Sequence, residues 1–129
     1  MKHAIPQMAK QGKGVIINVS SASAVRTFPH LGLYSASKAG LSTMSRVAAV
    51  EYAAQGILIK SICVGGVDTP MTEPSTSTPE GAAGLAAMHP LNRIAAPEEV
   101  AKAILWLSST EASFAIGPTL QFTGGMEMI

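Results

Sequence analysis

The chain has 129 residues, a length that suits one domain and not two. Hydrophobic residues make up 47% of it and charged residues only 13%, which argues against disorder and for a sheet that is covered on both faces. The formal net charge is +1 and no run of Lys or Arg occurs, so the composition argues against a nucleic-acid partner.

Cysteine usage and the apolar pattern bear on the location of the protein. Cys63 is the only cysteine, which rules out an internal disulfide framework and suits a reducing compartment. No uninterrupted apolar run approaches the length that spans a membrane, and the first residues contain no apolar signal-peptide core. We therefore expect a cytoplasmic protein without a membrane partner.

The first part of the chain alternates a helix, a strand and a loop. Apolar residues at helical spacing predict that residues 1–12 form the end of a helix. Residues 15–19 form a short β-branched run between Gly and Ser, which predicts a strand that is buried on both sides. The Pro-containing segment 21–32 is expected to be a loop.

A long helix is expected next, over residues 33–54, with Gly56 well placed to end it. Small residues crowd its first half and permit the close approach of a sheet or of another helix. Larger apolar residues supply a stripe of the kind that faces a core: Leu41, Met44, Val47 and Ala48. Residues 57–64 then form a second apolar strand.

Residues 72–96 are rich in Pro, Gly, Ser and Thr, and only a short helix is expected within them, near residues 82–88. So long and weakly structured a segment in a small domain is typical of a functional lid. We therefore interpret 72–96 as a substrate-lid loop.

The C-terminal part adds a helix and a third strand. Pro97 suits the first position of a helix, and Glu98 and Glu99 suit its positive N-terminal end. The helix has an apolar stripe that is expected to be buried: Val100, Ala101, Ile104, Leu105 and Leu107. The stretch TLQFTGG, residues 119–125, is expected to be a third strand with a Gly-Gly exit. Strands that alternate with helices indicate βαβ units and a parallel sheet, in which ligands bind at the carboxyl ends of the strands.

Tyr34 and Lys38, in the stretch YSASK, lie four residues apart on the expected helix and so share one of its faces. An ammonium group beside a phenol favours the phenolate, so the pair suits proton transfer. On periodicity alone, two solvated helix residues are the simpler interpretation.

The residues around this pair change that interpretation. Ser21 stands thirteen residues before Tyr34, within INVSSASA, and VGGVDTPM, RIAAPEEVAKAILWLSS and the terminal FTGG follow YSASKAGL in order. In this combination the chain resembles the second half of the short-chain dehydrogenase/reductase domain along essentially its whole length. The resemblance implies a partial Rossmann-like three-layer α/β fold in which three parallel strands are flanked by helices. Residues 1–129 would then be a single truncated domain without the N-terminal half of the usual sheet.

The resemblance also implies roles for individual residues. Tyr34 would be the general acid/base that exchanges a proton with the substrate oxygen, and Ser21 would hold the same oxygen. Lys38 would favour the phenolate and bind the nicotinamide ribose, to which Tyr34 would also lie close. The nicotinamide amide end would be held by residues that follow the second strand: Gly65, Gly66, Val67 and Thr69.

The implied reaction is the interconversion of a secondary alcohol and a ketone, with NAD or NADP as cofactor. The family's glycine-rich phosphate-binding turn does not occur in the chain, so weak cofactor binding is expected. Lys60 and Val64 stand where the family commonly has Asn and Pro, and the loss of this Pro is expected to loosen the turn beside the nicotinamide. Few charges in 72–96 favour a small neutral alcohol or ketone as substrate.

Partners follow from the same resemblance. The family's long helix packs against its copy in a dimer, so a homo-oligomer through helix 33–54 is expected. The alternative function is a non-catalytic module that dimerises or pairs with a full-length relative through this helix and the open edge of the first strand. The three histidines share no metal-ligand spacing, so no metal site is expected, and contact of His30 or His89 with substrate stays a minor alternative.

Overall fold

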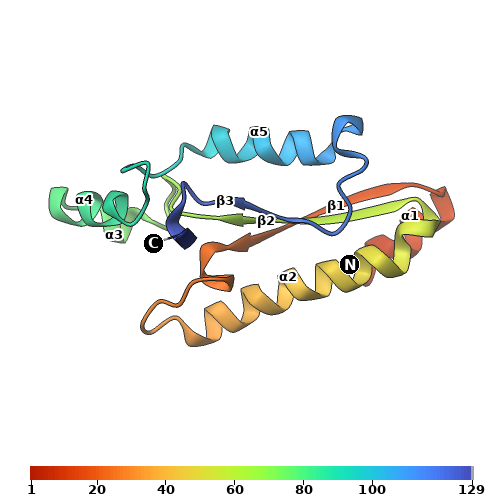
Figure 1. Ribbon diagram of the computed structural model, residues 1–129, viewed down its shortest axis with the longest axis horizontal. Coiled ribbons are helices and arrows are strands. Elements are labelled where there is room, and N and C mark those ends of the chain that lie inside the picture. The colour runs from red at the N-terminus through yellow and green to blue at the C-terminus, as the bar shows by residue number, and fades with distance from the viewer. Residues whose placement is uncertain (129) are drawn as a thin grey trace.

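A computed structural model describes residues 1–128 as three layers (Figure 1). The middle layer is a sheet of three parallel strands, which are β1 (Gly14–Ser21), β2 (Ile57–Val64) and β3 (Thr119–Phe122). Their order in the sheet is β1-β2-β3, so each strand is joined to its neighbour by a crossover through helices. The predicted α/β fold with three parallel strands flanked by helices is confirmed.

Helices cover both faces of this sheet (Figure 1). One face carries α1 (Ala4–Gln11) and α2 (Gly32–Tyr52), and the opposite face carries α5 (Pro97–Ser108). The long helix thus starts one residue before the predicted 33–54 and continues as a short 3₁₀ turn to Gln55. Gly56 follows with a φ of 75°, a left-handed conformation that glycine adopts without strain.

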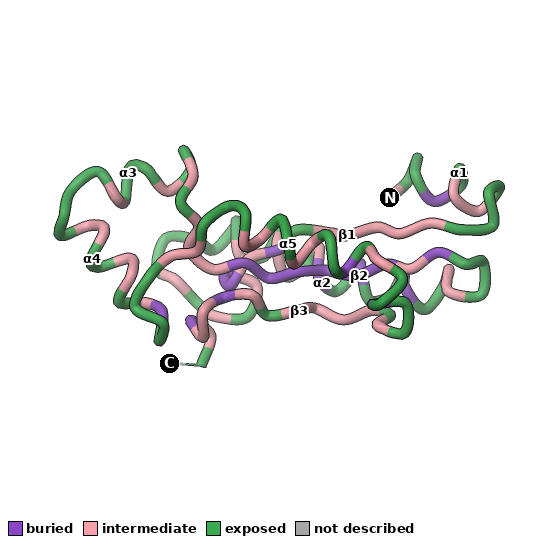
Figure 2. Tube along the Cα trace, turned by 90° about the horizontal axis from the view of Figure 1, so that it is seen from above, coloured by how far each residue is buried: buried purple, intermediate pink, exposed green. Residues whose placement is uncertain are grey.

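The central strand β2 is the most deeply buried part of the chain (Figure 2). It pairs with β1 along its full length, from Gly14 opposite Ile57 to Ser21 opposite Val64. β1 was predicted to be buried on both sides, but it lies at the edge of the three-stranded sheet and is mostly half-buried. The register brings the carboxyl ends of β1 and β2 together at one edge of the molecule.

Each face of the sheet has its own hydrophobic cluster. The side chains of Ile57 and Ile59 pack with Ala48 and Ala49 of α2 and with Ile5 of α1. On the opposite face, Ile62 and Val64 pack against Leu107 of α5, together with half-buried residues that include Val100, Ala103 and Ile104. The odd-numbered residues 57 and 59 face one cluster and the even-numbered residues 62 and 64 face the other, as the period of two in a strand requires.

The prediction of an apolar stripe on α2 is wrong in part. Met44 and Val47 are 53% and 52% exposed. The residues of α2 that are buried against the sheet are instead Ser42, Ser45 and Ala48. The serines can be buried because each finds a hydrogen-bond partner in β1, and their small size lets helix and strand approach closely. On α5, Ala101 and Leu105 are likewise exposed, and Ala103 takes a place in the cluster.

Segment 72–96 contains more helix than predicted. It holds α3 (Glu73–Thr76) and α4 (Pro79–Ala87), where only a short helix near 82–88 was expected. The Oγ1 atom of Thr78 accepts from the N–H of Gly81, and Pro79 occupies the first turn, so α4 begins with an ordinary capping signal.

Lys60 is completely buried in β2, although a lysine is rarely found in such a position. Its Nζ atom donates to the carbonyl of Leu107 and to the carbonyl of Ala112, both at 2.6 Å. These carbonyls lie in the last turn of α5 and in the 3₁₀ turn that follows it, where the helix dipole favours a cation. Burial lowers the pKa of Lys60 from its ordinary value of 10.5.

Within residues 1–128, no helix combines the length and the apolar character that crossing a membrane requires.

Candidate active site

A cavity of about 350 Å³ opens at the carboxyl ends of β1 and β2. Its walls come from the end of β1, the first turns of α2, the loop after β2 and the start of α5. Most of the predicted site residues line it together: Ser21, Tyr34, Lys38, Gly65, Val67 and Thr69. This is the position at which parallel α/β sheets bind ligands.

Tyr34 and Lys38 lie on the first turns of α2 and face the same cavity. The Nζ atom of Lys38 is 5.7 Å from the centroid of the Tyr34 ring, which is within the range of a cation–π interaction. The same ammonium donates a hydrogen bond of 3.1 Å to the carbonyl of Val19 in β1. Tyr34 is 38% exposed and lines the open cavity.

Ser21 is the last residue of β1 and the N-cap of the short 3₁₀ turn Ala22–Ala24. Its Oγ atom accepts from the N–H of Ser23 at 3.2 Å. Within residues 1–128 the Ser21 hydroxyl accepts this hydrogen bond but donates none, so it can donate to an oxygen atom placed in the cavity.

The backbone that carries Lys38 is fastened to β1 by buried serines. Ser20, which is buried, donates from Oγ to the carbonyl of Lys38 at 3.0 Å and accepts from the hydroxyl of Ser42 at 2.8 Å. One turn further along α2, the side chain of Asn18 donates to Ser45 at 2.7 Å. These hydrogen bonds fix the position of α2 relative to β1, and therefore the positions of Tyr34 and Lys38.

Replacing Ser20 with alanine should lower the free energy of unfolding by about 1–3 kcal/mol, because Ser42 and the Lys38 carbonyl lose a buried partner. Ser37→Ala, on α2, is the control for the loss of a serine hydroxyl. Its hydroxyl is exposed and bonds only its own helix, so we expect a change of about 0.5 kcal/mol or less. Urea unfolding of both variants measures the difference, and equal effects would show that these buried hydrogen bonds do not fasten α2.

The loop after β2 contributes the remaining predicted residues. The carbonyl of Val67 accepts from the hydroxyl of Thr72 and, over a longer distance of 3.4 Å, from that of Thr69. Gly66 differs from the other predicted residues because it does not line this cavity. Its N–H donates to His89 and its carbonyl accepts from Ala95, so both polar groups of its backbone are used within the protein.

Glycine is required at position 65 by close packing. A Cβ atom there would lie 2.8 Å from the carbonyl oxygen of Thr123 and 2.9 Å from Nε2 of His89, closer than real side chains approach. The loop therefore runs tightly between the exit of β3 and the end of segment 72–96.

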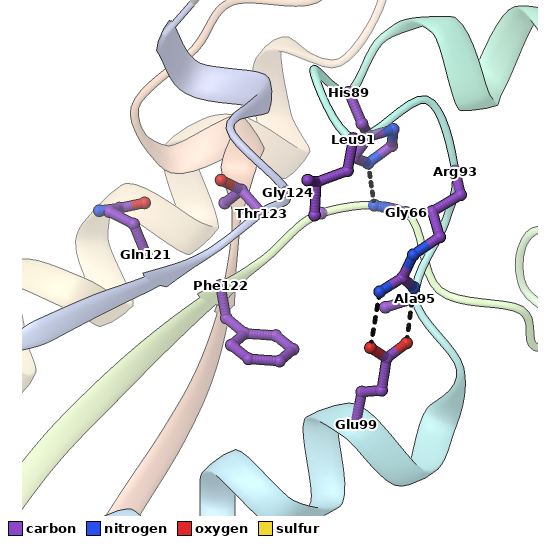
Figure 3. A pocket seen from close by; sticks show the side chains of 11 residues that line it. Gly66, His89, Leu91, Arg93, Ala95, Glu99, Gln121, Phe122, Thr123 and Gly124 are labelled. Carbon is purple, nitrogen blue, oxygen red and sulfur yellow. Dashed lines mark hydrogen bonds and ion pairs between the residues drawn. The ribbon is translucent and has the colours of Figure 1, made fainter.

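A second cavity, of about 170 Å³, is lined by both Gly65 and Gly66 (Figure 3). Its lining includes Leu91 and Arg93, which the sequence did not single out as site residues, and His89, which was considered only as a minor candidate for contact with substrate. At its rim Arg93 forms an ion pair with Glu99, with two N–O distances of 2.7 and 2.8 Å. Glu99 also accepts from the N–H of Ala96, so it caps α5 while holding the end of segment 72–96.

The hydrogen bond from Arg93, with help from the Ala96 N–H, lowers the pKa of Glu99 from 4.5 to about 2. A carboxylate with a lowered pKa in the folded state contributes stability above pH 4.5, and this contribution is lost as the pH falls toward 2. The stability difference between the natural chain and Glu99→Gln should therefore shrink over this pH range. Urea unfolding at pH 7 and pH 2.5 measures it, with Glu98→Gln as the control in the same turn.

A difference that stays constant between pH 7 and pH 2.5 would contradict this assignment. Glu98 makes no ion pair within residues 1–128, so its variant should show no comparable change.

The part of the chain that the structure describes contains no cluster of His, Cys, Asp or Glu that could hold a metal ion.

Comparison with known proteins places this arrangement in a family. The family model described as enoyl-(acyl carrier protein) reductase matches residues 1–127. The chain is 42% identical over 124 residues to cis-4-hydroxycyclohexanecarboxylate dehydrogenase of Sinomonas cyclohexanicum, covering 96% of this chain and 49% of that protein. It is 40% identical over 115 residues to 3beta-hydroxysteroid dehydrogenase 1 of Eggerthella lenta, covering 89% and 44%. The chain belongs to the short-chain dehydrogenase/reductase family.

Solved structures of short-chain dehydrogenases agree. A short-chain type dehydrogenase/reductase from Mycobacterium ulcerans superposes with a TM-score of 0.93 at 30% identity, covering 98% of this chain and 46% of that one. ElxO with NADP bound superposes with a TM-score of 0.92 at 29% identity, covering 100% and 52%. The chain thus spans about half the length of the relatives it matches, and by family it is an oxidoreductase.

Proposed function

We propose that the chain carries the proton-transfer site of an NAD(P)-dependent oxidoreductase that interconverts a secondary alcohol and a ketone. One observation carries this proposal: Ser21, Tyr34 and Lys38 line a single cavity together with the loop after β2. Three separate segments of the chain supply these residues.

Each side chain has a distinct task in the proposed reaction. Bound nicotinamide supplies the acceptor or donor of hydride. In the oxidation direction, the Tyr34 phenolate takes the proton of the substrate hydroxyl while the carbinol carbon gives up its hydride; in reduction, Tyr34 returns a proton to the carbonyl oxygen. Ser21 donates a hydrogen bond to the same oxygen, and the Lys38 ammonium favours the phenolate.

The residues present suit the nicotinamide and ribose end of the cofactor. Lys38 offers hydrogen-bond donors to ribose hydroxyls, and Gly65, Val67 and Thr69 bring the loop backbone and a hydroxyl to the same cavity. ElxO, a neighbour in fold, binds NADP. Because the 129 residues include no glycine-rich phosphate-binding turn, we expect weak binding of NAD or NADP to this chain.

The substrate side of the cavity is apolar. It is lined by Val19, Val64, Met71 and Val100. Among residues 1–128, Lys38 is the one charged residue that lines the cavity, which favours a small neutral alcohol or ketone. Two relatives are named for hydroxylated ring compounds, a hydroxysteroid and a hydroxycyclohexanecarboxylate. Segment 72–96 begins beside Met71 at the cavity wall, so we propose that it acts as the substrate lid.

The exposed face of α2 supports a homo-oligomer. Leu33, Met44, Val47 and Val50 leave much of their apolar surface in solvent, and burial against a second copy would remove it. Within residues 1–128 the outer edge of β1 pairs with no strand, which supports the alternative function, a non-catalytic module that binds a relative through this edge.

Titration of the purified chain with NADH and NADPH, followed by nicotinamide fluorescence, separates the two functions. Saturable binding, together with reduction of NAD or NADP by a cyclic secondary alcohol such as cyclohexanol, supports the oxidoreductase. A dimer in light scattering that neither binds dinucleotide nor turns over alcohol supports the non-catalytic module.

A further inference from the structure

His89 is a buried histidine for which the proposed reaction has no use. It follows α4 at the returning end of segment 72–96 and is only 3% exposed. Its ring lies over the backbone of Gly66, beside the second cavity (Figure 3). A buried polar ring needs partners, and the identity of those partners indicates what His89 does.

Both ring nitrogens of His89 are used. Nε2 accepts from the N–H of Gly66 at 2.9 Å, and Nδ1 lies 2.9 Å from the carbonyl oxygen of Leu85. A carbonyl only accepts, so Nδ1 must carry the proton, and Nε2 must be bare to accept from an amide. The two bonds thus define a neutral imidazole of one tautomer, which joins the loop after β2 to the last turns of α4.

The ring also fills the space that side chains at two glycines would need. A Cβ atom would lie 2.9 Å from Nε2 of His89 at position 65, and 2.9 Å from Cε1 at position 66. The backbone continues the restraint, since Gly66 accepts from the N–H of Ala95 at 2.9 Å. Gly66 is therefore held on both of its polar groups by the returning end of segment 72–96.

We propose that His89 is a positioning residue that fixes the loop of residues 65–67 and ties it to α4. Gly65 and Val67 line the cavity of Tyr34 on either side of Gly66, so a displaced Gly66 peptide would displace both of them. The consequence for the cofactor rests on the proposed function, whereas the hydrogen bonds of His89 can be tested without any cofactor.

Amide hydrogen exchange of the intact chain, followed by NMR, tests the positioning directly. His89→Leu should speed the exchange of the Gly66 amide roughly tenfold or more, because its buried acceptor is lost. The adjacent Gly65 amide donates to the carbonyl of Phe122 at 3.2 Å and should change much less. Equal acceleration of both amides, or of neither, would overturn the proposal.

Two further measurements cover a His89→Leu chain that does not fold. The oxygen of a glutamine side chain can replace Nε2 as acceptor, so His89→Gln should keep the Gly66 amide protected. In the natural chain, ¹⁵N shifts of the imidazole should show a protonated Nδ1 and a bare Nε2. Rapid exchange of Gly66 in His89→Gln, or the opposite tautomer in the natural chain, would overturn the proposal.

Dinucleotide titration tests the consequence for the cofactor. His89→Leu should weaken NADH or NADPH binding roughly tenfold, while His89→Gln and the exposed control His3→Gln bind like the natural chain. Unchanged affinity in His89→Leu would overturn the link to the cofactor loop. If the natural chain binds neither dinucleotide, the proposed function fails, and the exchange rates of Gly66 and Gly65 still decide the role of His89.

Discussion

Tyr34→Phe should lower the rate of alcohol oxidation by about 10²–10⁴-fold, the contribution that a positioned acid or base usually makes. The variant removes one oxygen atom and leaves the ring beside Lys38, so the stability of the chain and its affinity for dinucleotide should change little. The initial rate of NAD(P)H formation, measured at saturating alcohol, gives the loss directly.

Tyr52 provides the matched control for this substitution. It lies at the C-terminal end of the same helix, packed against the cluster around Ile57 and away from the cavity. Tyr52→Phe should therefore keep the natural rate. Activity of Tyr34→Phe within about threefold of the natural chain would show that Tyr34 does not transfer the proton, since the expected loss is at least about 10²-fold.

Lys60→Ala should lower the free energy of unfolding by about 2–5 kcal/mol, as other truncations of large buried side chains do. The substitution empties a buried space between β2 and the end of α5 and leaves the carbonyls of Leu107 and Ala112 without their donor. Because small domains are stable by only about 5–15 kcal/mol, the loss should be evident in urea unfolding and in the thermal midpoint.

Lys60→Met separates the volume of the side chain from its charge. Methionine keeps most of the buried volume and removes an ammonium whose burial is itself unfavourable, so we expect a smaller loss, about 2 kcal/mol or less. If the two variants lose equal stability, the hydrogen bonds of the ammonium are the dominant contribution and the cavity is not.

The stability difference between the natural chain and Lys60→Met should depend on pH, and the sign of this dependence follows from the pKa of Lys60. The folded state lowers the pKa of Lys60, so the unfolded chain binds the extra proton between that pKa and 10.5. The stability of the natural chain should therefore rise with pH in this window, relative to Lys60→Met, and gain nothing further above it. Urea unfolding of both proteins at pH 7 and pH 10 tests the sign.

The backbone of the fold was well predicted from the sequence because its signals are local. Short apolar runs predicted the strands, and the boundaries of β2 agree with the predicted 57–64, whereas β3 ends at Phe122 and is shorter than the predicted 119–125. Pro97 begins α5, and Gly12 and Gly56 follow helical segments in left-handed conformations, as their positions suggest. The same patterns indicated the order of the elements, and hence the parallel sheet.

Side-chain partners were predicted less well because they depend on contacts between distant parts of the chain. Ser42 and Ser45 are buried on α2 in place of Met44 and Val47, which becomes understandable only once Ser20 and Asn18 are seen opposite them. His89 gave no local sign of its role, because its two partners become neighbours only in the folded chain.

Some features of the site could be predicted from the sequence, and others depend on contacts between distant residues. Spacing and resemblance predicted that Ser21, Tyr34 and Lys38 belong together, and they line one cavity. Gly66 was expected beside the cofactor, yet it faces the second cavity and donates to His89. The turn after β2 was expected to loosen because position 64 is not proline. It is held instead by His89, in the C-terminal part of segment 72–96.

Titration with reduced nicotinamide mononucleotide tests the proposed site most directly. This compound carries the nicotinamide and its ribose without the adenosine half, so it depends little on a glycine-rich phosphate-binding turn. The proposed function predicts saturable NMR shift changes at the amides that line the first cavity: Ser21, Tyr34, Lys38, Val67 and Thr69. Changes centred instead on Leu91 and Gln121 in the second cavity, or no saturable change at all, would contradict it.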